Sequence, residues 1–120
     1  MKAKSIKGKS AAEIAMALTD GMADGFTPTL AIVFLSLGKD IKDVCTVLDA
    51  QGITIYGATT HGEFIDEEIG KESIAILLLD IHRDYFTVML EEFPEKNYRE
   101  VTQQMAKKAI AKFTTPAFLI

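Results

Sequence analysis

Hydrophobic residues follow two patterns along the chain, and each pattern predicts one kind of element. Two runs are apolar without alternation, Leu30–Leu35 and Ile74–Leu79, which is typical of strands covered on both faces. The shorter segment Ile53–Gly57 is rich in β-branched residues and favours a third strand. The segment Tyr85–Leu90 alternates imperfectly and predicts a fourth strand, antiparallel to Ile74–Leu79 after a turn at His82–Asp84.

Three other segments space their apolar residues by three and four, as an amphipathic helix does. The first begins at Ser10, which forms a capping box with Glu13. Asp40 is the expected N-cap of the second helix and Gly52 ends it, while Asn97 caps the third. The three apolar stripes are Ala11, Ile14, Ala15, Leu18 and Met22; Ile41, Val44, Cys45 and Leu48; and Val101, Met105, Ala109 and Phe113.

The order of these elements predicts the fold class. A strand at Leu30–Leu35, a helix and a strand at Ile53–Gly57, joined by short links, form a right-handed parallel unit. With Ile74–Leu79 in the same sheet, we expect an α/β or α+β fold, a mixed β-sheet with helices packed on it. No repeat or linker divides the chain, so residues 1–120 are expected to form one domain.

The C-terminal run Pro116–Ile120 is apolar, whereas chain ends are usually polar. We interpret it as a strand cut short, so that the chain is the N-terminal part of a larger domain. The unpaired strand would expose an apolar edge, which favours self-association into a homodimer.

Composition excludes several classes of protein. The chain has 13 basic and 17 acidic side chains and a formal net charge of −4, which argues against a nucleic-acid partner. Its longest apolar runs are six residues, whereas a membrane span needs about 20, so we expect a cytoplasmic protein. One cysteine, Cys45, excludes an internal disulfide and a thiolate-rich zinc site.

The most informative polar segment is Gly57–Phe64, which follows the strand at Ile53–Gly57. Ligands of open α/β sheets bind beyond the carboxyl ends of parallel strands. The other parallel strand ends near Ser36, so the two polar ends should meet. The predicted small-molecule site comprises Ser36, Thr59, Thr60, His61, Gly62 and Glu63. Alternatively, the segment is a polar turn in which the glycines supply flexibility.

The order of these features resembles the N-terminal half of a FIST domain, a sensory module of bacterial signalling proteins. The shared features are the alanine-rich first helix, the strand ending at Ser36, the glycine- and threonine-rich segment, and the strand Ser73–Leu79. The family's segment is matched at Gly57, Thr60, Gly62 and Glu63. Ala58 and Thr59 depart from it, because cysteine and serine are common there.

The resemblance implies a non-catalytic domain that binds a small ligand such as an amino acid and needs no cofactor. It also implies a second half of similar size and an attached output domain that receives the signal. Glu63 would bind the ligand's ammonium group, while Thr60 and nearby amides would bind its carboxylate.

Two other functions remain open. A small hydrolase or transferase would use His61 as a base and Ser36 or Thr60 as a nucleophile. An oligomerisation module would use an open strand edge. The His-x-Glu sequence that starts at His61 matches half of a zinc-deaminase signature, but the Pro-Cys-x-x-Cys half is absent, so no metal site is expected. Cys45 on an apolar stripe and His82 in a turn are not expected to be catalytic.

Overall fold

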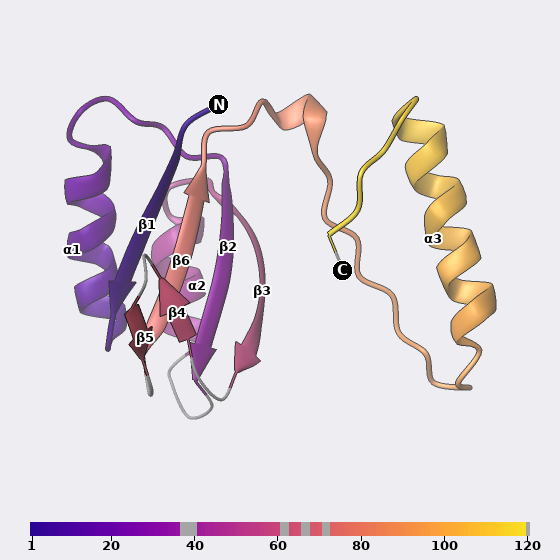
Figure 1. Cartoon of the computed structure of the whole chain (residues 1–120), viewed down its shortest axis with the longest axis horizontal. Coiled ribbons are helices and arrows are strands. Elements are labelled where there is room, and N and C mark those ends of the chain that lie inside the picture. The colour runs from indigo at the N-terminus through magenta and orange to yellow at the C-terminus, as the bar shows by residue number, and fades with distance from the viewer. Residues whose placement is uncertain (37–40, 61–62, 66–67, 71–72, 120) are drawn as a thin grey trace. The chain divides into compact units, whose positions relative to one another are not determined.

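A computed structural model of the chain describes residues 1–36, 41–60, 63–65, 68–70 and 73–119, with residues 60, 63–65 and 68–70 described by their backbone only. The chain forms two compact units, Met1–Thr87 and Val88–Ile120, and each is described by itself. The elements, labelled in Figure 1, are β1 (Ala3–Gly8), α1 (Ala11–Met22), β2 (Leu30–Ser36), α2 (Ile41–Asp49), β3 (Thr54–Thr60), β4 (Glu63–Ile65), β5 (Glu68–Gly70), β6 (Ile74–Leu79), the 3-10 turn η1 (Arg83–Tyr85) and α3 (Tyr98–Lys112).

The first unit is built on a four-stranded mixed sheet with the order β1-β6-β2-β3. Strands β2 and β3 are parallel, and β6 is antiparallel to both of its neighbours, β1 and β2. The predicted parallel pair and the predicted place of β6 in the same sheet are therefore confirmed, and the fold is α/β. Strands β4 and β5 form a separate antiparallel pair.

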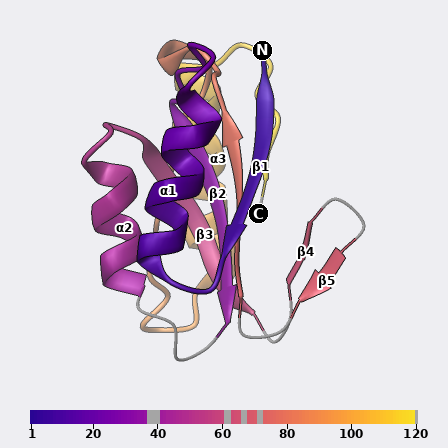
Figure 2. The same cartoon turned by 90° about the vertical axis from the view of Figure 1, so that its left-hand side faces the viewer.

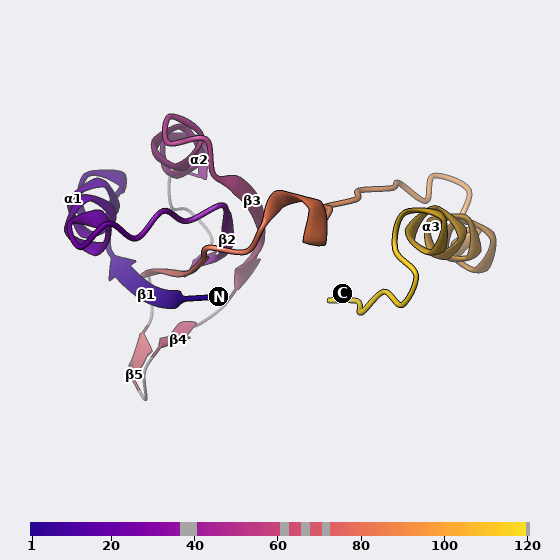
Figure 3. The ribbon, with the colours of Figure 1, turned by 90° about the horizontal axis from the view of Figure 1, so that it is seen from above.

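Helices α1 and α2 cover one face of the sheet (Figure 2). The connections β1–α1–β2 and β2–α2–β3 both step across the sheet in the same direction. Because such crossovers are right-handed, their helices come to lie on the same face. Figure 3 shows β4 and β5 on the opposite side of the sheet from these helices.

The core lies between the sheet and these two helices. Alternation along β2 shows this, because Ala31, Val33 and Leu35 are buried, whereas Phe34 on the other face is 42% exposed. The largest fully buried side chains are Ile14, Leu48, Ile74, Ile76, Leu78 and Val44. Burying one large aliphatic side chain of this kind contributes about 1.5–3 kcal/mol.

Local signals set the helix ends. The Ser10 hydroxyl accepts a hydrogen bond from the Glu13 N–H at 3.2 Å, and Glu13 Oε2 accepts one from the Lys9 N–H at 2.6 Å. The predicted cap at Ser10 is therefore confirmed, with the return bond shifted by one residue. After α2 the chain turns at Gly52, whose φ of +69° suits glycine.

Helix α2 matches its predicted stripe in part. Val44 and Leu48 are buried and Cys45 is half-buried, but Ile41 is 46% exposed, so its predicted place in the core is wrong. Ile41 is the first residue of the helix. Asp40, the predicted N-cap, lies outside the described residues.

One strand prediction is wrong. Residues 85–90 form no strand: η1 ends at Tyr85, and the rest belongs to no helix or strand. The physical reason is that β6 already bonds to β1 on one side and β2 on the other, so a following strand has no side of β6 to pair with. Residues 116–119 pair with no strand among the described residues, so the interpretation of Pro116–Ile120 as a strand cut short, and the self-association inferred from it, stay predictions.

The second unit is organised around α3. Val101 and Ala109 are buried, as the stripe predicts, and Met105 and Phe113 are half-buried. The Lys108 ammonium lies 2.7 Å from a Glu91 carboxylate oxygen, and the Phe93 and Tyr98 rings lie 5.0 Å apart. These contacts hold the preceding segment against the helix.

Asn97 is the N-cap residue of α3, as predicted, but its side chain makes no capping hydrogen bond. Among the residues that the structure describes, no helix is both long enough and apolar enough to cross a bilayer.

Candidate functional site

The carboxyl ends of β2 and β3 lie side by side. In the parallel register, Leu35 is the partner of Thr59, and Ser36 is the partner of Thr60. Neighbouring strands are about 4.8 Å apart, so the last residues of the two strands are adjacent. The short crossover through α2 brings together two polar chain segments that are more than twenty positions apart in the sequence.

These hydroxyl residues do not all belong to the same face of the sheet. Side chains alternate along a strand, so Thr59 shares the helix-covered face with Leu35, and Ser36 belongs to the opposite face. Thr59 is exposed, whereas Ser36 is only 6% exposed. The Ser36 N–H donates to the Ser73 carbonyl at 3.2 Å, which ties the end of β2 to the start of β6.

Glu63 opens β4, whose backbone returns to the sheet. Strand β4 lies close to β2 and β6, on the side of the sheet opposite the helices (Figure 3). The backbone at Glu63 is therefore on the side to which Ser36 belongs. His61 and Gly62, the other two predicted site residues, lie outside the described residues.

Gly57 does not lie in a turn, as the alternative interpretation of Gly57–Phe64 would have it. It lies within β3, and a Cβ atom there would overlap the Val33 carbonyl oxygen and lie 2.9 Å from the carbonyl carbon. The interpretation of Gly57 as a source of turn flexibility is therefore wrong. The residue is small because β3 approaches the backbone of β2 closely at this point.

The remaining titratable candidates have simple structural environments. Cys45 is half-buried on α2. His82 caps η1, because its Nδ1 accepts a hydrogen bond from the Asp84 N–H at 3.3 Å. Within the described part of the chain, no three His, Cys, Asp or Glu side chains come together as metal ligands.

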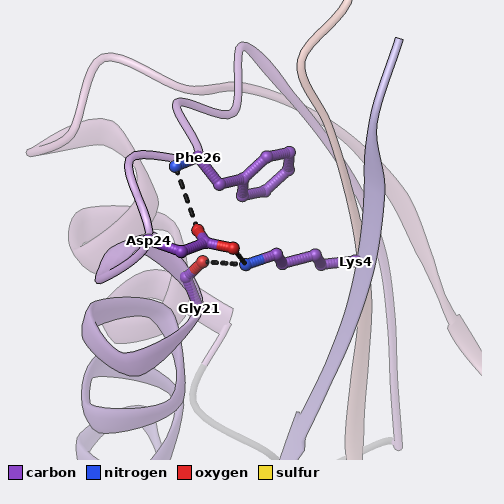
Figure 4. Close-up of polar contacts among 4 residues, drawn as sticks. All are labelled: Lys4, Gly21, Asp24 and Phe26. Atoms are coloured by element: carbon purple, nitrogen blue, oxygen red, sulfur yellow. Dashed lines mark hydrogen bonds and ion pairs between the residues drawn. The ribbon is translucent and has the colours of Figure 1, made fainter.

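Figure 4 shows a polar cluster that the sequence pattern does not predict, because β1 has no clear strand pattern. Lys4 Nζ on β1 lies 2.8 Å from an Asp24 carboxylate oxygen and donates to the Gly21 carbonyl at 2.6 Å. The Phe26 N–H donates to the other Asp24 oxygen at 3.1 Å. The cluster joins β1 to the end of α1.

The same contacts set the charge state of Asp24. The hydrogen bond from Lys4 first, and then the bond from the Phe26 N–H, hold the pKa of the Asp24 carboxyl below its usual value. The Asp24 carboxylate and the Lys4 ammonium bind each other, so the cluster stabilises the fold. Neither charged group is aimed at a ligand.

The second unit has an open hollow of about 530 Å³ at the N-terminus of α3, lined by Lys96, Asn97, Tyr98, Arg99, Glu100 and Gln103. Asn97 Oδ1 is buried and has no hydrogen-bond partner among the residues that the structure describes. The hollow contains none of the predicted site residues.

Comparison of the chain with models of known protein families finds no match, and neither does a search of curated proteins or of solved structures. The candidate site is therefore defined by the adjacent ends of β2 and β3 and by the start of β4.

Proposed function

We propose that this chain is a non-catalytic sensory domain of the FIST kind that binds a small, amino-acid-like ligand. The observation that supports the proposal best is the register of the parallel strands, which makes Ser36 and Thr60 partners at the carboxyl end of the sheet. That end is where open α/β sheets bind ligands. The sequence resemblance adds the sensory role and transfer of the signal to an attached output domain, and the short apolar runs of the sequence favour a cytoplasmic location.

The chemistry of the segment suits a zwitterion. Threonine hydroxyls and backbone N–H groups near Gly62 would bind a carboxylate, and the Glu63 carboxylate would bind an ammonium group. Ser36 is nearly buried, so its role in the proposal is to order the end of β2. Thr59 belongs to the other face, so its exposed hydroxyl is assigned to the rim of the site.

The hydrolase or transferase alternative receives less support. A serine nucleophile must be reachable by the substrate and must lie within hydrogen-bond reach of a base. Ser36 is only 6% exposed, and its N–H donates to the carbonyl of Ser73, the residue before β6. This burial favours a structural role for Ser36.

Thermal denaturation with a panel of amino acids tests the proposal. A ligand at about 100 times its Kd stabilises the folded state by about 2.7 kcal/mol, which raises the Tm of a domain of this size by roughly 10 °C. We expect at least one amino acid to raise the Tm of the wild-type chain. We expect Glu63→Gln to abolish that shift without changing the Tm of the unliganded protein.

Glu92→Gln is the matched control, because it makes the same chemical change at an exposed position of the second unit. It should keep the ligand shift. If no amino acid raises the Tm of the wild-type chain, the proposed ligand class is wrong. If Glu63→Gln lowers the unliganded Tm by several degrees and keeps the ligand shifts, Glu63 is structural and the site assignment is wrong.

A further inference from the structure

The two edges of the main sheet differ in character. The edge strands are β1 and β3, and among the described strands each of them bonds to one neighbour only. An edge strand presents a row of unpaired N–H and C=O groups, which can pair with another chain unless charge or proline prevents it. The two edges can therefore be compared for such protection.

Strand β1 is protected and β3 is not. Exposed lysines lie along and beside β1, at Lys2, Lys7 and Lys9. In contrast, Ile53–Thr60 contains no charged residue and no proline. Gly57, Ala58 and Thr59 are consecutive exposed residues, so small uncharged groups line this edge.

The backbone of β3 has a defined outward side. The Thr54 N–H donates to the Thr29 carbonyl at 2.9 Å, so the N–H and C=O groups of Thr54 point toward β2. Because this direction alternates along a strand, the groups of Ile55, Gly57 and Thr59 point away from β2. Within the described residues these outward groups make no backbone hydrogen bond.

We propose that the β3 edge pairs with β3 of a second copy of this chain, antiparallel and about a twofold axis near Gly57. A twofold axis requires one patch to be complementary to itself. Here it would pair Gly57 with the partner's Gly57, Ile55 with the partner's Thr59 and, by symmetry, Thr59 with the partner's Ile55. These three hydrogen-bonded pairs supply roughly six backbone hydrogen bonds and join two four-stranded sheets into one.

The charges on the two edges favour pairing of β3 with β3 of a second copy over pairing of β1 with β1. Pairing β3 with β3 brings no like charges together, whereas pairing β1 with β1 would oppose the lysines of two copies. Arg83 donates to the Gly52 carbonyl and, at 3.5 Å, to the Thr54 hydroxyl, so its charge lies at the start of β3, beside the segment that pairs. The protected β1 edges remain outermost, so assembly stops at a dimer.

Sedimentation equilibrium tests the proposal. We expect a dimer with a Kd below about 100 µM, in keeping with a small interface. Thr59→Pro removes an outward N–H but no bond to β2, and we expect it to weaken the dimer at least tenfold, with Thr59→Ala as the control that keeps the dimer. If the proline variant does not fold, Ala58→Lys replaces it, because like charges then meet near the axis, and Ala58→Gln is its control.

Hydrogen exchange of individual amides tests whether the β3 edge forms the dimer interface. The amides of Tyr56 and Ala58 should be protected at every protein concentration, because they bond to β2. The amides of Ile55, Gly57 and Thr59 should become protected only at concentrations where the dimer forms. A wild-type chain that stays monomeric up to about 500 µM would overturn the proposal. A dimer whose outward β3 amides exchange freely, or one that both edge variants leave intact, would overturn it equally.

Discussion

Gly57→Ala probes the closest approach between two strands of the sheet. The added methyl group would overlap the Val33 carbonyl oxygen and lie 2.9 Å from its carbonyl carbon and 3.0 Å from its Cβ. All three atoms belong to the backbone of β2 or are fixed directly to it, so they cannot rotate away as the end of a flexible side chain could. The methyl group can be accommodated only if β2 and β3 move apart.

The expected cost follows from this rigidity. Overpacking a well-packed core costs about 1–3 kcal/mol, and occasionally more. Because the obstructing atoms are backbone, we expect a loss of at least about 3 kcal/mol in the free energy of unfolding. For a domain of this size that lowers the Tm by roughly 10 °C or more. Urea unfolding followed by circular dichroism at a few micromolar protein measures the loss with little contribution from association.

Gly21→Ala makes the same chemical change where there is room. Among the described residues, and apart from the backbone of α1 itself, a Cβ at Gly21 would meet only Ile6 Cγ2, at 3.9 Å, and alanine favours the helix by about 0.5–1 kcal/mol. The two glycine variants should therefore change stability in opposite directions. If the free energy of unfolding of Gly57→Ala lies within about 1 kcal/mol of the wild-type value, the close approach of β2 and β3 is not as described and the reasoning fails.

Two further predictions concern the core and the polar cluster of Figure 4. Leu48→Ala should lower the free energy of unfolding by about 2–5 kcal/mol, because Leu48 is fully buried; a loss below 1 kcal/mol in urea unfolding would contradict its place in the core. Asp24→Asn should lower the Tm at neutral pH, because the pKa of Asp24 is lowered in the folded state, chiefly by the hydrogen bond from Lys4. The stabilisation is present above the unfolded value of 3.8 and is lost as the pH falls through the lower folded value. The gap between variant and wild-type Tm should therefore close on acidification, and a gap that is independent of pH would show that the carboxylate charge contributes nothing.

The sequence predicts the central strands of the sheet well, because they are apolar without interruption. The predicted cover on both faces is wrong, because Phe34 and Leu77 are 42% and 37% exposed. The uninterrupted apolar runs of β2 and β6 correspond to the two central strands, and the short links around α2 predict the parallel pair. The sequence does not predict β1, because it is an edge strand with one buried side chain, Ile6. The lysines of β1 obscure the hydrophobic pattern of a strand. The strand is stabilised by its pairing with β6, which is distant in the sequence.

Other elements depend on tertiary structure that local pattern does not reveal. Residues 85–90 have strand-like composition, yet the sides of β6 are occupied by strands from elsewhere in the chain. Register likewise decides the candidate site: it makes Ser36 and Thr60 partners and puts Thr59 on the other face. A one-residue change of register would reverse the faces, and no single-sequence pattern fixes the register of two parallel strands.

The position of β6 in the sheet constrains the order in which the protein can assemble. Strand β6 is the last of the four main strands in the sequence, yet it lies between β1 and β2. During synthesis, β2, α2 and β3 can associate through contacts between near neighbours in the chain, whereas β1 has no strand partner until residues 74–79 have been made. Contacts between residues so far apart in sequence slow folding. The nascent chain must therefore keep its lysine-rich first strand solvated and leave a space one strand wide beside β2, and the sheet is completed by insertion into its middle.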